Sequence, residues 1–238
     1  MEKSDSPIII KPRSVAFVLL AIILCLLIMC VVTQYTRFEM GRSNTGIVRS
    51  FDVNKEFNIP STFSAVILLL SSCLLGLISR HKKTHKESFV FHWTLLAFIF
   101  LYLSVDEAGK IHELTMGPVR RLFDAEGFLF FAWVIPAFFF LIAFAVAYWK
   151  FLFHLPRKYQ ILFCTAGAVY IAGALGLEMV GARYVWLHGK RSFLYSMITV
   201  VEEGLEMTGV LIFIYALLDY MKGNLKNILI HFGDSGSG

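Results

Sequence analysis

Long apolar runs divide the chain, and several of them are long enough for a helix to cross a lipid bilayer. The run at 15–32 contains no charged residue, and a membrane-spanning helix needs about 20 predominantly apolar residues. Hydrophobic residues make up 57% of the chain and charged residues only 16%, which is below the charged share of soluble domains. These features predict an all-α integral membrane protein.

Six membrane-spanning helices are expected to form one bundle. They are predicted at 14–34, 60–79, 89–110, 128–149, 160–181 and 193–220. Lys11 and Arg13 precede the first run as they would in a signal peptide, but the run is too long and lacks an A-x-A cleavage site. Because no polar stretch is long enough for a soluble domain, we expect one transmembrane domain over 1–232. Residues 233–238 look like a flexible tail or a cloning remnant.

The basic loop at 80–86 sets the expected orientation of the bundle. It reads Arg-His-Lys-Lys-Thr-His-Lys, and short loops rich in Lys and Arg face the cytoplasm. With six spans, this orientation places the N and C termini on the cytoplasmic side. The net charge of +5 is spread over the loops, which suits anionic lipid surfaces and gives no indication of nucleic-acid binding.

Eight of the 17 acidic residues fall at one predicted depth, on the side opposite the basic loop. These residues are Glu56, Asp106, Glu107, Glu113, Glu178, Glu202, Glu203 and Glu206. Three of them interrupt the apolar run at 192–218, although a charge at the bilayer centre costs about 2.5 kcal/mol or more. Such residues normally face a protein interior, a cavity or a metal ion, so the group predicts a functional centre.

Helical spacing relates the acids of the sixth span to the fifth. At about 100° per residue, Tyr195, Glu202 and Glu206 share one stripe of the sixth span. The fifth span is rich in Gly and Ala between 167 and 181, and small residues let neighbouring helices come close. This packing would bring Glu178 against the sixth span.

The end of the third span carries a second group of polar side chains. Asp106, Lys110 and Glu113 are predicted to share one stripe at i, i+4 and i+7. If the helix is regular, Glu107 and His112 are too far apart in angle to bind one ion.

The mixture of carboxylates and one histidine suggests a metal centre. It suits Fe, Mn or Zn, and it suits Mg or Ca if the histidine does not itself bind the ion. The expected metal ligands are His112, Glu113, Glu178, Glu202 and Glu206, with Glu203 or Asp106 as general base. The expected neighbours in the pocket are Glu56, Asn58, Glu107, Lys110, Arg183 and Tyr195. The structural alternative is that the glutamates form ion pairs with Lys110, Arg183 or Arg191.

Several common functional motifs are absent from the sequence. The four cysteines, at 25, 30, 73 and 164, lie in apolar runs without a CxxC spacing, so neither a disulfide framework nor a thiolate metal site is indicated. The sequence has no HExxH, GxSxG or P-loop motif. It also lacks the paired Glu-x-x-His motifs of soluble di-iron bundles.

Three motifs together resemble an uncharacterised family of multi-pass bacterial inner-membrane proteins. They are EFNIPSTFS at 56–64, DEA at 106–108 followed by HE at 112–113, and EEGLEMTG at 202–209. The resemblance covers most of the chain from Glu56 onward. It implies a location in the cell inner membrane and no particular reaction, and it draws attention to Glu56, Asn58 and Ser64.

We therefore expect a metal-dependent membrane enzyme, a hydrolase or an oxidoreductase, that acts on a lipid or other apolar substrate. The first alternative is a proton- or cation-coupled transporter or channel, because intramembrane acids also form proton relays. The second alternative is a non-catalytic membrane assembly subunit. Membrane lipids are the expected partners, and homo-oligomerisation through the small residues of the fifth span remains open.

Overall fold

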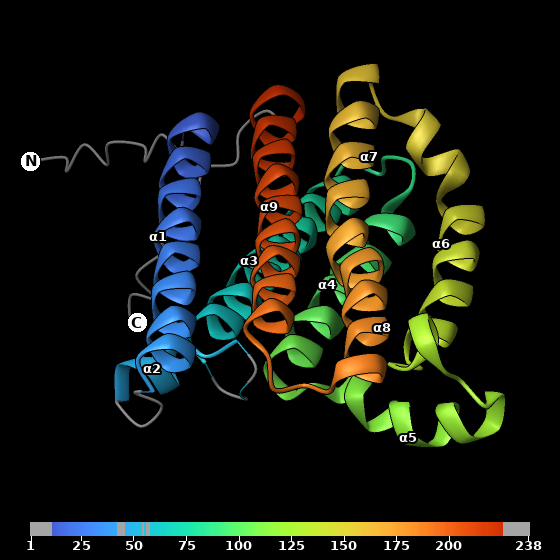
Figure 1. The fold of residues 1–238 in the computed structure, drawn as a ribbon. Helices are drawn as coiled ribbons and strands as arrows, with labels where there is room; N and C mark the ends of the chain where they lie inside the picture. Colours follow the sequence, from blue (N-terminus) through green and yellow to red (C-terminus); the bar gives the residue numbers. More distant parts are fainter. Residues whose placement is uncertain (1–10, 42–45, 54, 56–57, 226–238) are drawn as a thin grey trace, which may run out of the picture.

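The described part of the chain is helical. The computed structural model describes residues 11–41, 46–53, 55 and 58–225, and these contain no strand. Figure 1 shows the helices as a bundle. The elements are α1 (Pro12–Glu39), α2 (Gly46–Ser50), α3 (Ile59–Thr84), α4 (Val90–Gly109), α5 (Ile111–Phe123), η1 (Gly127–Leu129), α6 (Val134–His154), α7 (Arg157–Ile171), η2 (Ala172–Leu177), α8 (Glu178–His188) and α9 (Phe193–Asn224). The predicted all-α fold is confirmed for these residues.

Five segments of the described chain are long and apolar enough to cross a membrane. They are α1, α3, α4, α6 and the continuous segment Arg157–His188, which joins α7, η2 and α8. These segments correspond to the first five predicted spans, and they indicate a membrane protein. The helix α9 covers the sixth predicted span and is not among the five, so the six-span arrangement remains a prediction.

The helix α9 forms the centre of the bundle. It packs against α1, α3, α7, η2 and α8, and Figure 1 shows it between α1 and α7. The side chains of Ile214 and Leu217 are completely buried and join Trp93 in the main hydrophobic core. Large apolar side chains on α1 and α6, such as Phe17 and Val146, are 74% exposed. An exposed apolar surface of this kind marks a membrane-facing or partner-facing region.

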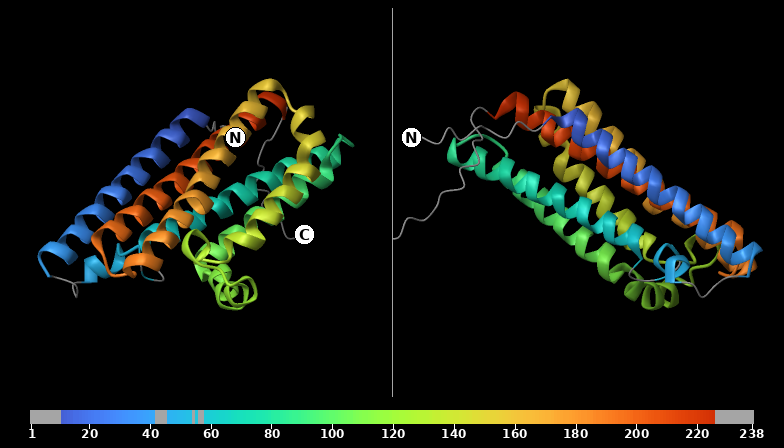
Figure 2. Two further views of the ribbon diagram at one scale, coloured as in Figure 1. Left: turned by 45° about the vertical axis from the view of Figure 1, so that its right-hand side comes forward. Right: turned by 90° about the vertical axis from the view of Figure 1, so that its left-hand side faces the viewer.

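The helices run alternately between two ends of the bundle. Figures 1 and 2 show the first residues of α1, the last residues of α9 and the α3–α4 connection at one end. This connection contains the basic loop at 80–86. The opposite end holds α2, α5 and the connection from α8 to α9. The start of α1 and the end of α9 thus lie at the same end as the basic loop, whereas the six-span topology and its orientation in a membrane stay predictions.

Polar side chains fix the starts of α3 and α9. The buried side chain of Asn58 accepts a hydrogen bond from the N–H of Ser61 at 2.8 Å, and Pro60 occupies the first turn of α3. Ser192 accepts one from the N–H of Tyr195 at 3.0 Å. Both residues satisfy backbone amides that a helix start leaves without a partner. Asn58 therefore has a structural role as a helix cap.

The third predicted span, 89–110, corresponds to α4, which ends at Gly109. Lys110 takes a left-handed conformation with a φ of 47°, and α5 then runs across the end of the bundle (Figure 1). The carboxylate of Asp106 accepts a hydrogen bond from the backbone N–H of His112 at 2.7 Å, which satisfies a free amide at the start of α5. The prediction that Asp106, Lys110 and Glu113 share one helical stripe is therefore wrong, because the helix breaks between them.

Candidate functional site

Five glutamates from three helices form a cluster at the end of the bundle opposite the basic loop. Glu107 lies on α4, Glu178 begins α8, and α9 carries Glu202, Glu203 and Glu206. We term these five residues the acid centre. Glu107 interacts electrostatically with Glu203 and Glu206, and Glu178 interacts with all three glutamates of α9. Carboxyl groups that are distant in sequence are thus close enough to influence one another.

Two glycines allow the helices around this cluster to pack closely against each other. A Cβ atom added to Gly173 would lie 2.8 Å from the backbone oxygen of Glu202 and 3.0 Å from Cγ of Glu206. A Cβ atom added to Gly209 would lie 2.7 Å from the backbone nitrogen of Tyr170. Any side chain at either glycine would therefore push the helices apart. The small residues of the fifth span bring α7 and η2 against α9, as their composition predicts.

A π-helical segment, η2, immediately precedes Glu178. A π turn adds a residue to the helical turn and changes the direction in which the following side chains point. Such turns occur frequently at functional sites. The sequence predicts a regular fifth span, and its Gly- and Ala-rich composition is the one signal that could have indicated the irregularity.

Glu178 connects the acid centre to the start of α6. The indole Nε1 of Trp133 donates a hydrogen bond to Oε1 of Glu178 at 2.8 Å. The carboxyl groups of Glu178 and Glu202 also lie close enough to interact electrostatically. Two buried carboxylates that lie close together repel each other, so a proton or a cation near the pair would stabilise it.

Asp106 and His112 form a second pair beside the acid centre. One oxygen of Asp106 lies 2.8 Å from Nδ1 of His112, and the other accepts the backbone N–H of the same residue. The ring of His112 also packs against Trp133, with 4.7 Å between centroids. When a carboxylate accepts a hydrogen bond from Nδ1, it leaves Nε2 available as a ligand, as in many metal-binding histidines. Asp106 is therefore placed to orient His112.

The acid centre has little positive charge to balance it. In the part of the chain that the structure describes, no Lys, Arg or His forms an ion pair with any of its five glutamates. Lys110 interacts at longer range with Glu107 and Glu203, but its Nζ lies 3.3 Å from Oε1 of Glu113. The Oε2 atom of Glu203 is buried and has no hydrogen-bond partner among these residues. Buried carboxylates require compensation, which here must come from protons or from a bound cation.

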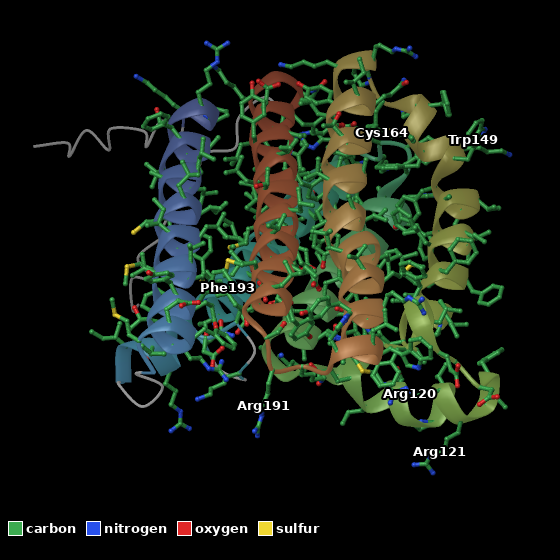
Figure 3. All side chains as sticks on the ribbon, in the orientation of Figure 1. Arg120, Arg121, Trp149, Cys164, Arg191 and Phe193 are labelled. Carbon is green, nitrogen blue, oxygen red and sulfur yellow. The ribbon has the colours of Figure 1, made fainter. Side chains whose placement is uncertain are left out.

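The arginines considered as alternative counter-ions are engaged elsewhere. The guanidinium of Arg183 packs over the ring of Trp186, 4.9 Å from its centroid. Figure 3 shows the side chain of Arg191 pointing away from the end of the bundle. Neither arrangement supports the alternative that these residues neutralise the glutamates of α9.

The remaining predicted residues lie at the edge of the acid centre or outside it. Glu113 is exposed at the start of α5, where it pairs with Lys110. Tyr195 packs against Gly181 and interacts with Glu178 and Glu202. Asn58 caps α3, and the predicted pocket residue Glu56 lies outside the described residues.

The predicted metal ligands do not form a closed ligand set. Among the described residues, no group of three His, Cys, Asp or Glu side chains lies close enough to hold a metal ion. The donor chemistry of the acid centre suits a divalent cation, but its spacing does not. Each glutamate side chain has three rotatable bonds, so binding would require these side chains to turn towards one point.

Comparison with protein families finds one match. A family model described as a domain of unknown function, DUF8692, matches residues 16–221. The chain belongs to this family. The match agrees with the expected resemblance to an uncharacterised family, and it carries no information about a membrane. Neither the curated proteins nor the solved structures contain a match.

Proposed function

We propose that this DUF8692 protein is a metal-dependent membrane enzyme, a hydrolase or an oxidoreductase, and that the acid centre is its active site. The proposal depends on five glutamates from three helices that have no ion-pair partner among the described residues. A divalent cation would offset their charge. Carboxylate oxygens and imidazole nitrogen are ligands that Fe, Mn and Zn accept, and carboxylates alone suit Mg or Ca.

Individual residues would have distinct roles in this centre. Glu178, Glu202, Glu206 and Nε2 of His112 would bind the ion, and the ion would act as a Lewis acid towards a substrate oxygen. Glu203 would serve as general base, because its Oε2 atom has no hydrogen-bond partner among the described residues. Asp106 would hold His112 in the orientation that binding requires.

A lipid or another apolar molecule is the proposed substrate. Five segments of the described chain have the composition of membrane spans, and large apolar side chains cover the outer surface of α1 and α6. A substrate dissolved in the bilayer could approach the acid centre between helices, whereas a polar substrate would have to approach from the water-facing end.

Metal analysis tests this proposal directly. Protein purified without chelators should contain about one or two equivalents of a transition metal, measured by inductively coupled plasma mass spectrometry. The double variant Glu202→Ala/Glu206→Ala should contain no bound metal. Asp219→Asn is a matched control, because Asp219 also lies on α9 but pairs with Lys158 at the other end of the bundle. If the wild-type protein cannot be loaded with any divalent metal, a metal-dependent function is excluded.

Proton-coupled transport is a second candidate, and the interaction between the carboxyl groups of Glu178 and Glu202 favours it. Neighbouring carboxyl groups inside a membrane protein could take up and release protons during a transport cycle. Protein reconstituted in liposomes should then carry a proton flux that Glu202→Gln abolishes. Flux in metal-free protein would support transport over catalysis, whereas activity that depends on added metal would support the enzyme.

We also propose that the protein lies in the inner membrane with six spans and both termini in the cytoplasm. The basic loop at 80–86 supports this orientation, and it lies at the same end of the bundle as the start of α1 and the end of α9.

A further inference from the structure

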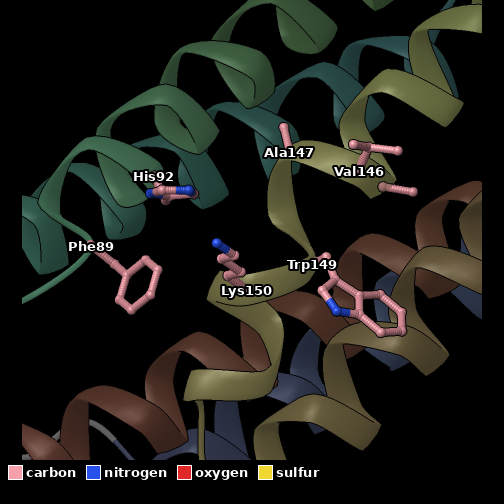
Figure 4. Close-up of a pocket in the computed structure, with 7 residues that line it drawn as sticks. Phe89, His92, Val146, Ala147, Trp149 and Lys150 are labelled. Carbon is pink, nitrogen blue, oxygen red and sulfur yellow. The ribbon is translucent and has the colours of Figure 1, made fainter.

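A second candidate site lies at the basic-loop end of the bundle, away from the acid centre. It is a pocket between the start of α4 and the last turns of α6, with a volume of about 440 Å³. Figure 4 shows its lining, which consists of Phe89, His92, Ala145, Val146, Ala147, Trp149 and Lys150. Most of this lining is apolar, and its polar groups are the side chains of His92 and Lys150.

The ring of His92 is fixed by the aromatic side chains around it. It stacks on Phe151, with 5.6 Å between centroids and an angle of 4° between the planes. Phe89 and Tyr148 pack on it in edge contacts at 5.1 and 5.5 Å. The Nδ1 atom of His92 is buried without a hydrogen-bond partner among the described residues, so the pocket is lined by the rest of the imidazole ring.

Lys150 provides a positive charge on the opposite wall of the pocket. Figure 4 shows its ammonium group pointing across the pocket towards His92. Within the described chain, Lys150 has no acidic residue in ion-pair contact. The pocket therefore presents one cation opposite an imidazole ring, a combination that suits a single anionic oxygen group.

The surroundings of the pocket indicate which chemical class of anion it would bind. Both walls belong to helices with the composition of membrane spans, and α6 continues from the pocket as an exposed apolar surface. Phe139, Val146 and Phe153 on this helix are each more than half exposed. Basic pockets between membrane helices bind anionic lipid headgroups. A lipid would place its phosphate between His92 and Lys150 and its acyl chain along α6.

We propose that this pocket binds the phosphate of an anionic phospholipid. Lys150 supplies the charge, and the imidazole ring of His92 contacts the phosphate from the opposite wall. The proposal does not depend on the function of the acid centre, because none of the pocket residues belongs to that centre.

Lipid binding can be measured on the full chain in detergent by native mass spectrometry, with phosphatidylglycerol and phosphatidylcholine as probes. The wild-type protein should retain phosphatidylglycerol preferentially. Lys150→Gln should bind it about tenfold more weakly, since a charge-assisted hydrogen bond contributes of that order. His92→Phe, which preserves the aromatic packing, should also weaken binding. Lys150→Arg keeps the positive charge and should bind phosphatidylglycerol as the wild-type protein does. Retained binding in this variant would show that Lys150→Gln acts through the lost charge and not through loss of the fold.

Lys83→Gln is the matched control, because Lys83 is exposed at the same end of the bundle and does not line the pocket. Equal losses in Lys83→Gln and Lys150→Gln would show attraction to the surface charge alone and would overturn the proposal. Equal retention of both lipids would also overturn it. Displacement of the lipid by millimolar inorganic phosphate would identify a site for free phosphate instead of a lipid.

Discussion

Asp106 shows how one carboxylate can serve the fold and the site together. Its two oxygens bind the backbone and the ring of His112, so it stabilises the break after α4 and fixes the histidine next to Trp133. The sequence placed Asp106 among the candidates for general base, a role for which it would have to give up these contacts. Within the described part of the chain, Glu203 has no comparable contact at Oε2.

Asp106→Asn tests this positioning role at the residue scale. An amide cannot accept a hydrogen bond from Nδ1 of His112 as strongly, so the proposed metal affinity should fall about 10- to 100-fold. A competition titration with a metal indicator would measure the change, and Asp219→Asn should leave the affinity unchanged. Unaltered affinity in Asp106→Asn would show that the pair does not support metal binding.

Glu87 provides a pH-dependent prediction outside the apolar segments. The ammonium of Lys82 donates a hydrogen bond to Glu87 at 2.6 Å, which holds the pKa of Glu87 below its usual range. A lowered carboxyl pKa stabilises the folded state above the pKa of the unfolded chain, and this contribution disappears as pH falls through the folded-state pKa. The contribution is screened because 41% of the Glu87 side chain is exposed.

Glu87→Gln should therefore destabilise the protein by roughly 0.5–1 kcal/mol at about pH 7, and by less at about pH 3.5. Thermal unfolding in detergent at the two pH values would measure both effects. An equal loss at both would mean that the ion pair is not the cause.

At the scale of elements, the contact between η2 and α9 decides how the acid centre is assembled. The Gly and Ala residues of the fifth span predict close packing, but they do not reveal which residues of α9 lie opposite. The structure places Gly173 against the backbone of Glu202 and the side chain of Glu206. The π-helical turn next to it then sets the position of Glu178.

Gly173→Ala should separate these two elements. The added methyl group would lie 2.8 Å from a backbone oxygen that cannot rotate away, so a loss of about 1–3 kcal/mol is expected from overpacking. Gly167→Ala on α7 is the control, because an added Cβ there meets nothing within 4 Å. It should be neutral or stabilise the helix by up to about 1 kcal/mol. Equal melting temperatures for both variants would contradict the close contact.

At the scale of the whole molecule, the two ends of the bundle differ in chemistry. The acid centre and α5 lie at one end, and the basic loop and the pocket around Lys150 lie at the other. If the basic loop faces the cytoplasm, the acid centre lies towards the outer surface of the membrane. The lipid pocket would then face the leaflet on the cytoplasmic side.

Cysteine labelling in intact cells can test this orientation. Arg191→Cys lies in the exposed connection before α9 and should react with a membrane-impermeant maleimide from outside. Lys83→Cys lies at the opposite end and should react only after cell lysis. The parent protein, whose four cysteines lie in apolar runs, provides the background. Labelling of Lys83→Cys in intact cells would place the basic loop outside the cell and would contradict the proposed orientation.

The sequence by itself determined the helical class, the approximate positions of the helices and the presence of many acids near one end. These features are local, because the length of an apolar run and the position of a charge within it are properties of one segment. The third span was predicted to end near residue 110, but the change of helix direction there was missed, since it depends on Asp106 reaching the amide of His112 across the turn. The helix α5 was missed with it.

Only the tertiary structure decided which of the acids lie together. It joined Glu107, Glu178 and the three glutamates of α9, left Glu113 at the exposed edge, and placed Asn58 in a helix cap. It also brought His92 and Lys150 to opposite walls of one pocket. The physical reason is that such groupings depend on how non-neighbouring helices pack and rotate, which the period of a single helix does not specify.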